Sequence, residues 1–298
     1  MDTCASSLTP ATAYGVGAFA AIVYVAGLYL VPARFRALPR DDPRHVRARM
    51  LTLLPSTGLA CAASAATYAA HTGPGCLPVL DAYGVGSLRA LAGPRTVLAP
   101  LLLTALLFLG PLCVSLEEAR RHAAAESWPA ALRAEWARRT LLPGLPWLAL
   151  RNLAVAPLTE EAVFRAGVLP LLLLAGVARD RALWTSPLLF GIAHAHHGFR
   201  AYAVERRPLA QCVATTAVQL AYTSVFGLYA GFVFVRGRSL AAAVLAHAFC
   251  NVMGLPDLSF LQAGHPLQPE RAGLAAAYAA GIAGFRWGLG PLTGAGVG

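Results

Sequence analysis

Long stretches without a charged residue constrain this chain more than any other feature. They cover residues 5–33, 50–80, 97–116, 208–235 and 239–256. A helix needs about 20 apolar residues to cross a bilayer, and at least four of these stretches reach that length or nearly so. Backbone groups inside lipid must bond within their own segment, so helices are the expected element. The sequence therefore predicts an all-α, polytopic transmembrane helical bundle.

Composition supports this class over a soluble one. Only 13% of the residues are charged and 57% are hydrophobic, whereas a soluble domain carries about 25% charged residues. No internal repeat and no long linker divides the chain, so residues 1–298 are predicted to form a single integral membrane domain. About eight spans are expected, at 11–32, 49–70, 97–116, 141–158, 160–178, 183–198, 209–235 and 239–256. A last apolar segment near 272–289 is rich in Gly and Ala.

The net charge of +10 has a topological interpretation. The arginines gather in short loops between the apolar segments, as the positive-inside rule expects. The loops after the first and third spans are therefore predicted to be cytosolic, and the 71–96 loop, with only Arg89, Arg95 and Asp81, lumenal or external. A third group of arginines is predicted to lie in cytosolic loops as well: Arg200, Arg206, Arg207, Arg236 and Arg238. No nucleic-acid motif accompanies the basic charge.

Two further segments carry predictions. The charged, Ala-rich stretch 117–139 is expected to form an amphipathic interfacial helix, with Trp128 and Trp136 at headgroup depth. The N-terminal apolar run lacks a basic region before it, so it is interpreted as a retained first span rather than a cleaved signal peptide.

The six cysteines are scattered and form no CxxC pair. Most lie inside apolar stretches, where a free cysteine acts as a small hydrophobic residue. The sequence therefore predicts neither a disulfide framework nor a cysteine-based metal site.

The segment APLTEEAVFRAG, residues 156–167, places charge in an apolar region. Glu160, Glu161 and Arg165 are the only charged residues between 154 and 177. Pro157 favours a helix start here, with Thr159 as N-cap and both glutamates in the first turn. Glu161 and Arg165 are four residues apart and can form an ion pair. Glu160 points about 100° away, so it is left for another role.

Two more polar clusters lie in apolar stretches, and ionisable side chains there usually face a bundle interior or a water-filled cavity. FGIAHAHH contains His194, His196 and His197, and HAFCN contains His247 and Asn251 four residues apart. Each cluster could also be purely structural. His196 and His197 suit a position at the headgroups, and His247 with Asn251 suits a polar link between helices.

Together the three clusters predict an intramembrane polar cavity with hydrolytic chemistry. A carboxylate and a histidine can share the work of a general base on water. A histidine and an asparagine can donate hydrogen bonds to a developing oxyanion. No GxSxG surrounds a serine, and a thiol mechanism through Cys250 is the minor alternative.

The ordered set of motifs resembles the type II CAAX prenyl endopeptidases. It reads Glu160-Glu161-x-x-x-Arg165, Phe190-x-x-x-His194 and His247-x-x-x-Asn251. The flanking segments, such as RNLAVAPLTEEAVFRAGVLPLL, look like the eukaryotic members. The resemblance covers about residues 151–257, which are taken as the catalytic core.

The resemblance implies an intramembrane endopeptidase that removes the last three residues of prenylated CaaX proteins, such as small GTPases. It assigns water activation to Glu160 and His194 and the oxyanion site to His247 and Asn251, without a metal ion. Glu161 and Arg165 would support the site. It also implies a multi-pass protein of the endoplasmic reticulum membrane, with the lipid bilayer and the prenylated proteins as partners and no nucleic acid.

Three alternatives remain open. Glu160, His194 and His247 make a plausible two-histidine, one-carboxylate zinc set, although HExxH is absent. A membrane scaffold could retain the fold without the reaction. A transporter is the last alternative, but no inverted repeat supports it.

Overall fold

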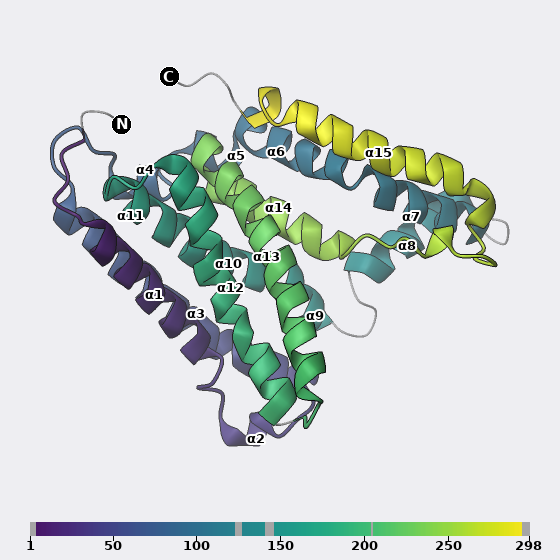
Figure 1. Ribbon diagram of the computed structural model, residues 1–298, viewed down its shortest axis with the longest axis horizontal. Helices are drawn as coiled ribbons and strands as arrows, with labels where there is room; N and C mark the ends of the chain where they lie inside the picture. Colours follow the sequence, from purple (N-terminus) through teal and green to yellow (C-terminus); the bar gives the residue numbers. More distant parts are fainter. Residues whose placement is uncertain (1–3, 123–126, 141–145, 204, 294–298) are drawn as a thin grey trace.

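The computed structural model describes residues 4–122, 127–140, 146–203 and 205–293 (Figure 1). These residues are helical apart from their connections, and the described part contains no strand beyond an isolated bridge between Ser6 and Thr72. Within it, four helices are long and apolar enough to cross a membrane: Pro10–Gly27, Pro43–His71, Leu88–Leu107 and Leu209–Gly237. The predicted all-α polytopic membrane fold is confirmed.

The first two long helices form an antiparallel hairpin. Helix α1 (Pro10–Gly27) and helix α3 (Pro43–His71) pack along each other, joined through the short α2 (Ala33–Arg36). Both begin with a side-chain cap and a proline in the first turn, which satisfies free backbone N–H groups at the helix start. A Cβ on Gly27 would collide with Ser56, so glycine permits the close crossing at this point.

A single helical run passes through the middle of the molecule. It consists of α9 (Pro146–Leu150), the π-helical η1 (Arg151–Val155), α10 (Ala156–Glu161), the π-helical η2 (Ala162–Gly167) and α11 (Val168–Leu174). The predicted division into spans 141–158 and 160–178 is therefore wrong, and residues 141–145 lie outside the described part. The predicted N-cap is also wrong, because the Thr159 hydroxyl donates to the carbonyl of Val155 at 2.8 Å within the run.

The π-helical turn η1 explains why Pro157 does not start a helix. The N–H of Ala156 bonds the carbonyl of Arg151, five residues back. The next such bond would join residue 157 to the carbonyl of Asn152, and proline has no N–H to make it. The wider turn admits the proline ring, so the helix continues and one carbonyl is left free.

Proline divides a different predicted span. The expected helix over 97–116 is two helices, α6 (Pro94–Leu107) and α7 (Leu109–His122), with a break at Phe108. Pro111 cannot donate to the carbonyl of Leu107, where α6 ends. The segment 117–139 is likewise not one helix. Its first part ends α7, its last part belongs to α8 (Trp128–Thr140), and residues 123–126 lie outside the described part.

The remaining long helices complete the bundle. Helices α12 (Arg179–Ala203) and α13 (Leu209–Gly237) form a second antiparallel hairpin, and α14 (Leu240–Met253) returns behind it (Figure 1). Helix α15 (Arg271–Gly288) packs on α6 and α7 and is held to α7 by an ion pair of 2.7 Å between Arg121 and Glu270.

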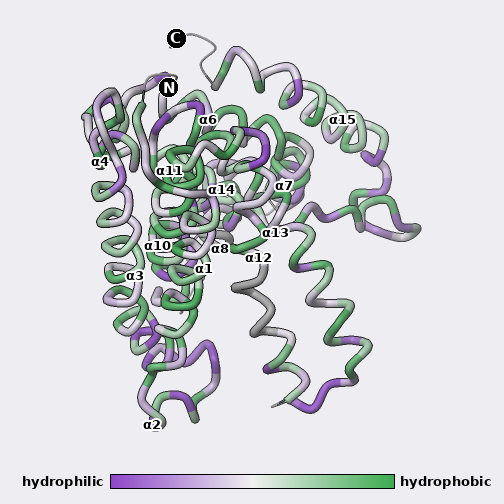
Figure 2. Tube along the Cα trace, turned by 60° about the vertical axis from the view of Figure 1, so that its left-hand side comes forward, coloured by the Kyte–Doolittle hydropathy of each residue, from purple (hydrophilic) through white to green (hydrophobic). Residues whose placement is uncertain are grey.

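Helix α11 lies at the centre of the largest apolar core, and the outside of the bundle is apolar as well. Leu169, Leu171 and Leu172 are fully buried. Conversely, Ile22 and Val225 are 68% and 71% exposed on helices α1 and α13. Hydrophobic colouring runs along the outer helices in Figure 2, as expected of surfaces that face lipid.

The bundle has two ends. The α2 end contains residues 28–42 and 205–208, and the α4 end contains residues 4–9, 72–93 and 238–239, with the short α4 (Val79–Ala82) and α5 (Leu88–Ala92). Arg200, Arg206 and Arg207 lie at the α2 end, but Arg236 and Arg238 do not. The N–H of Leu240 bonds the carbonyl of Gly84 at 3.2 Å, so the end of α13 lies with the 71–96 loop. The placement of all five arginines on one side is therefore wrong.

A disulfide between Cys4 and Cys76 corrects the prediction that the chain has no disulfide. The two cysteines are 72 residues apart in sequence, and no spacing pattern links them. The hairpin of α1 and α3 brings them together, because Ala5 exchanges backbone hydrogen bonds with Gly73 and Pro74 at 2.8 and 3.2 Å. The free cysteines in the described part are Cys61, Cys113, Cys212 and Cys250.

The disulfide predicts the number of reactive thiols. In denatured wild-type protein without reductant, we expect a maleimide to label the four free cysteines, and to label all six after reduction. Cys4→Ser should expose Cys76 and give five labels, whereas Cys61→Ser should give three. Mass spectrometry of the labelled protein counts the adducts. Six adducts on the unreduced wild type would contradict the bond.

Candidate active site

The structure brings five of the six predicted site residues together. Glu160 and Glu161 end α10, Arg165 lies in η2, and His247 and Asn251 lie on α14, which packs against α10 and η1. The sixth, His194, lies on α12, and its side chain is outside the described residues, as are those of His196 and His197.

Glu161 is the most buried ionisable group of the site, with no exposed surface. Its Oε1 lies 3.1 Å from Nη1 of Arg165 and 2.7 Å from Nδ1 of His247. The predicted ion pair between Glu161 and Arg165 is confirmed. A buried carboxylate needs such partners, because transfer of an unpaired charge out of water costs several kcal/mol or more.

Arg165 is stabilised by aromatic rings as well as by charge. Its guanidinium carbon lies 4.8 Å from the centre of the Phe190 ring and 5.4 Å from that of Phe226. A cation over the face of a ring is attracted by the ring quadrupole. Within the described residues its terminal nitrogens make no hydrogen bond, so ion pairing and the ring faces balance the charge.

His247 connects the two glutamates. Its side chain is 9% exposed, and the ring packs on Phe226, with centroids 4.7 Å apart. When Glu161 is ionised, Nδ1 donates to it, and this fixes the orientation of the ring. The other nitrogen, Nε2, lies 3.9 Å from Oε2 of Glu160. That distance is too long for a direct hydrogen bond and suits one bridging water.

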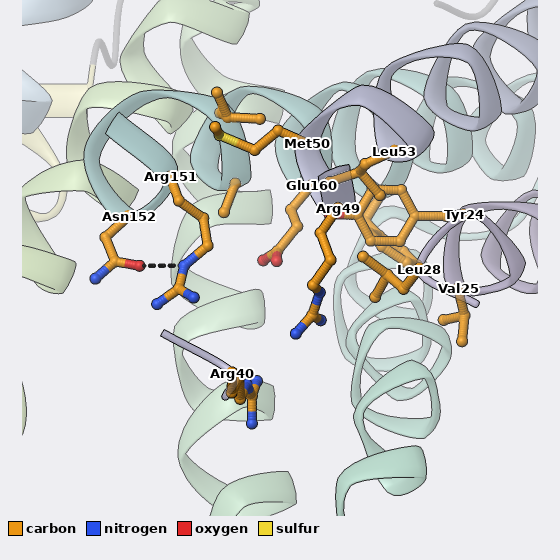
Figure 3. A pocket seen from close by; sticks show the side chains of 13 residues that line it. Tyr24, Val25, Leu28, Arg40, Arg49, Met50, Leu53, Arg151, Asn152 and Glu160 are labelled. Atoms are coloured by element: carbon orange, nitrogen blue, oxygen red, sulfur yellow. Dashed lines mark hydrogen bonds between the residues drawn. The ribbon is translucent and has the colours of Figure 1, made fainter. Parts of the chain in front are cut away.

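Glu160 faces a cavity. Its side chain is 17% exposed and lines a cavity of about 220 Å³, together with Tyr24, Arg49 and Arg151 (Figure 3). The cavity is lined by the end of α1, the start of α3 and η1, so it opens toward the α2 end. The adjacent carboxylates thus lie in different environments, Glu161 buried among its partners and Glu160 in contact with solvent space.

Asn251 completes the hydrogen bonding of the π-helical turn. Its Nδ2 donates to the carbonyl of Asn152 at 2.8 Å, which is the carbonyl that Pro157 leaves without a backbone partner. A buried or half-buried carbonyl without a donor is unfavourable, so this bond holds α14 against η1. The amide NH₂ has two hydrogens, and no acceptor among the described residues takes the second, which lies beside the cavity residue Asn152.

The cavity includes residues outside the predicted catalytic core of 151–257. Tyr24 comes from α1, and its hydroxyl lies 3.1 Å from Oγ1 of Thr159, next to Glu160 in the chain. Arg49 comes from α3 and Arg40 from the loop before it. The signal for these arginines is the basic run after the first span, from which sequence analysis predicts topology alone.

The zinc alternative involves a residue whose side chain is not described. Among the described side chains, no three His, Cys, Asp or Glu residues come together as a metal site. The predicted zinc set contains His194 besides Glu160 and His247.

Comparisons with known proteins agree with the motifs. Residues 142–253 match a family model described as "Type II CAAX prenyl endopeptidase Rce1-like". The chain is 35% identical over 280 residues to CAAX prenyl protease 2 of Homo sapiens, covering 91% of this chain and 78% of the human protein. It is 35% identical over 227 residues to CAAX prenyl protease 2 of Arabidopsis thaliana, covering 72% and 68% of the two chains.

A third relative, the probable CAAX prenyl protease 2 of Schizosaccharomyces pombe, is 32% identical over 255 residues. The match covers 82% of this chain and 82% of the relative. No solved structure matches the chain significantly.

We expect a large loss of stability when one partner of the buried ion pair is removed and the other is kept. Arg165→Met leaves Glu161 without its cation, so the free energy of unfolding should fall by about 3–5 kcal/mol. The double variant Arg165→Met, Glu161→Gln should recover part of that loss, since it removes the uncompensated charge. Denaturant unfolding in one detergent gives the free energy of unfolding of the wild type, the single variant and the double variant. A single-variant loss below about 1 kcal/mol would show that the pair is not a main support of the site.

Gly227 on α13 predicts a steric effect on the same arginine. A Cβ at this position would lie 2.9 Å from Cβ of Pro187 and 3.3 Å from Nη2 of Arg165. Gly227→Ala should therefore lower the free energy of unfolding by roughly 1–3 kcal/mol. Gly58→Ala on α3 is the matched control, because nothing lies within 4 Å of its Cβ, and it should be neutral or slightly stabilising. Equal effects of the two substitutions would contradict the packing argument.

Proposed function

The chain belongs to the type II CAAX prenyl endopeptidases, and from that premise we propose that it removes the last three residues of prenylated CaaX proteins with a water activated by Glu160. It is a multi-pass membrane peptidase. The observation that carries the proposal is the unequal placement of the two glutamates, Glu161 in a buried ion pair and Glu160 in the wall of the cavity. Only the second can reach both water and substrate.

Glu160 acts as the general base in this mechanism. It accepts a proton from the water, and the resulting hydroxide attacks the scissile carbonyl carbon. The carboxyl group then returns this proton to the amine nitrogen of the departing tripeptide as the C–N bond breaks. The resemblance implies that His194 shares the activation of the water. Such acid–base catalysis contributes about 10²–10⁴-fold to a rate.

His247 and Asn251 stabilise the negative charge on the former carbonyl oxygen. In this proposal His247 carries a proton on both ring nitrogens, so that Nδ1–H donates to Glu161 and Nε2–H donates to the oxyanion. Asn251 offers its second amide hydrogen. Loss of one oxyanion donor costs about 10²–10³-fold in other hydrolases.

The architecture suits a lipid-modified substrate. The prenyl chain can stay in the bilayer against the apolar outer faces of the helices, while the peptide and water enter the cavity. The substrates proposed are prenylated proteins of the small GTPase kind, and the membrane proposed is that of the endoplasmic reticulum.

Two observations support an orientation with the α2 end in the cytosol, where prenylated proteins occur. The cavity opens at that end, among its arginines, and positive loops favour the cytosolic side. The disulfide lies at the α4 end, and disulfides persist in oxidising compartments such as the lumen.

We propose that the reaction needs no metal ion. Arg49 and Arg151 line the same cavity as Glu160, and two guanidinium groups there repel a dication. The buried pair of Glu161 with Arg165 also commits Glu161 to a partner other than a metal.

The test is cleavage of a farnesylated CaaX peptide by purified protein in detergent, with the released tripeptide detected by mass spectrometry. Glu160→Gln should lower kcat by at least about 10²-fold, because a general base is lost. Glu205→Gln, on the exposed turn after α12, is the control and should keep the wild-type rate.

The same assay separates the alternatives. Activity that survives a zinc chelator supports the metal-free mechanism, and loss that zinc restores supports the zinc set. No tripeptide release by the folded wild-type protein would contradict the proposed reaction and leave a scaffold of the same fold.

A further inference from the structure

Three arginines share the cavity wall with a single glutamate. Arg40, Arg49 and Arg151 line the cavity, and Glu160 is the acidic residue among the residues that line it. In Figure 3, Arg49 and Arg151 lie on either side of Glu160 and Arg40 lies below them. The cavity therefore carries an excess of positive charge next to the proposed general base.

The protein only partly neutralises these guanidinium groups. Arg151 donates from Nε to Oδ1 of Asn152 at 2.9 Å, which is an uncharged partner. Its Nη1 lies 3.8 Å from Asp41, whose side chain is 66% exposed, so solvent screens that pair. For Arg40 and Arg49, no ion pair with a described carboxylate is found. Arginines gathered in a cavity without full compensation are typical of a site for an anionic group.

The surrounding structure holds the arginines in place. Nδ1 of the buried His45 lies 3.2 Å from the carbonyl of Leu38 and 3.3 Å from that of Pro39, which fixes the turn before Arg40. Asp42 caps α3 and accepts from the backbone N–H of Arg44 at 2.8 Å. Hydrogen bonds from Arg44 hold the pKa of Asp42 below its ordinary value. The arginines are thus presented by an ordered segment.

We propose that Arg49 and Arg151, with Arg40 at the mouth of the cavity, bind the C-terminal carboxylate of the substrate. This inference rests on the proposed function. An enzyme that always cuts three residues from the end must recognise the end, and the free carboxylate is the feature that distinguishes it. Three extended residues span at most about 10–11 Å, so the carboxylate must lie in the same cavity as the scissile bond.

The geometry and the size of the cavity favour this ligand over a lipid headgroup. Guanidinium groups match a carboxylate with paired, charge-assisted hydrogen bonds. The volume of about 220 Å³ is below the roughly 300–1,000 Å³ of a typical small-molecule site, which suits the end of a peptide.

The experiment compares two farnesylated CaaX peptides that differ only at the C-terminus, one a free acid and the other an amide. For wild-type protein in neutral-lipid vesicles, we expect kcat/KM to favour the acid by about tenfold or more, mainly through KM. Arg49→Gln and Arg151→Gln should bring this acid-to-amide ratio toward one. Arg36→Gln is the matched control, since Arg36 is exposed on α2 at the same end of the bundle, and should keep the wild-type ratio.

A binding measurement makes the test independent of catalysis. Fluorescence anisotropy of the two labelled peptides with Glu160→Gln protein gives their Kd values directly, and we expect tighter binding of the acid. Equal Kd values for acid and amide would overturn the inference, whether or not cleavage occurs. Retained cleavage of the acid by Glu160→Gln would instead contradict the proposed function, so the two failures are distinguishable.

Two further outcomes are informative. If the arginine variants lose activity equally on both peptides, and only in vesicles with anionic lipid, the cluster binds lipid headgroups and the inference is wrong. Because a neutral side chain in the cavity can impair folding, Arg49→Lys is measured beside Arg49→Gln. It keeps the charge but loses the paired hydrogen bonds, so it should show an intermediate ratio. A wild-type ratio in both Arg49 variants and in Arg151→Gln would overturn the inference.

Discussion

The contact between Glu161, Arg165 and His247 is the interaction on which the site depends. It joins two helical elements that are far apart in sequence, η2 and α14, through one fully buried carboxylate. The carboxylate cannot be left alone in an apolar bundle, and neither can the arginine, so each fixes the other. His247 takes its orientation from Glu161, and this leaves Nε2 directed toward Glu160. The geometry of the candidate site is thus a consequence of charge compensation in a low-dielectric interior.

The π-helical turns give the central helix the irregularity that the site uses. In a regular α-helix the ring of Pro157 would clash with the carbonyl of Leu153, four residues back, and leave that carbonyl without a donor. At Pro157 the missing N–H and the wider turn leave the Asn152 carbonyl to Asn251. Helix α14 is therefore bonded to η1 at this point by the side chain of Asn251, which is itself part of the candidate site. Local irregularity and the position of a functional residue have the same cause.

The sequence predicted what depends on residue type and short spacing. Charge-free stretches predicted the membrane helices, and the four-residue spacing of Glu161 and Arg165 predicted their ion pair, because both follow from local geometry. Long-range features were not predictable in this way. The disulfide needed the hairpin that brings Cys4 to Cys76, and the cavity needed the packing of α1 and α3 on the central helix, which adds Tyr24 and Arg49. Residue type alone makes Pro157 a helix start, whereas the structure accommodates it after a π-helical turn within a continuous run.

The bond between Cys4 and Cys76 also changes the topology of the covalent chain. One cysteine precedes α1 and the other follows α3, so the whole first hairpin lies inside a closed ring. A protease that cuts the connection at α2 opens this ring without releasing a fragment, and α1 stays covalently attached from the opposite side of the membrane. The wall of the cavity that α1 supplies, including Tyr24, is therefore secured at the end of the bundle remote from the site.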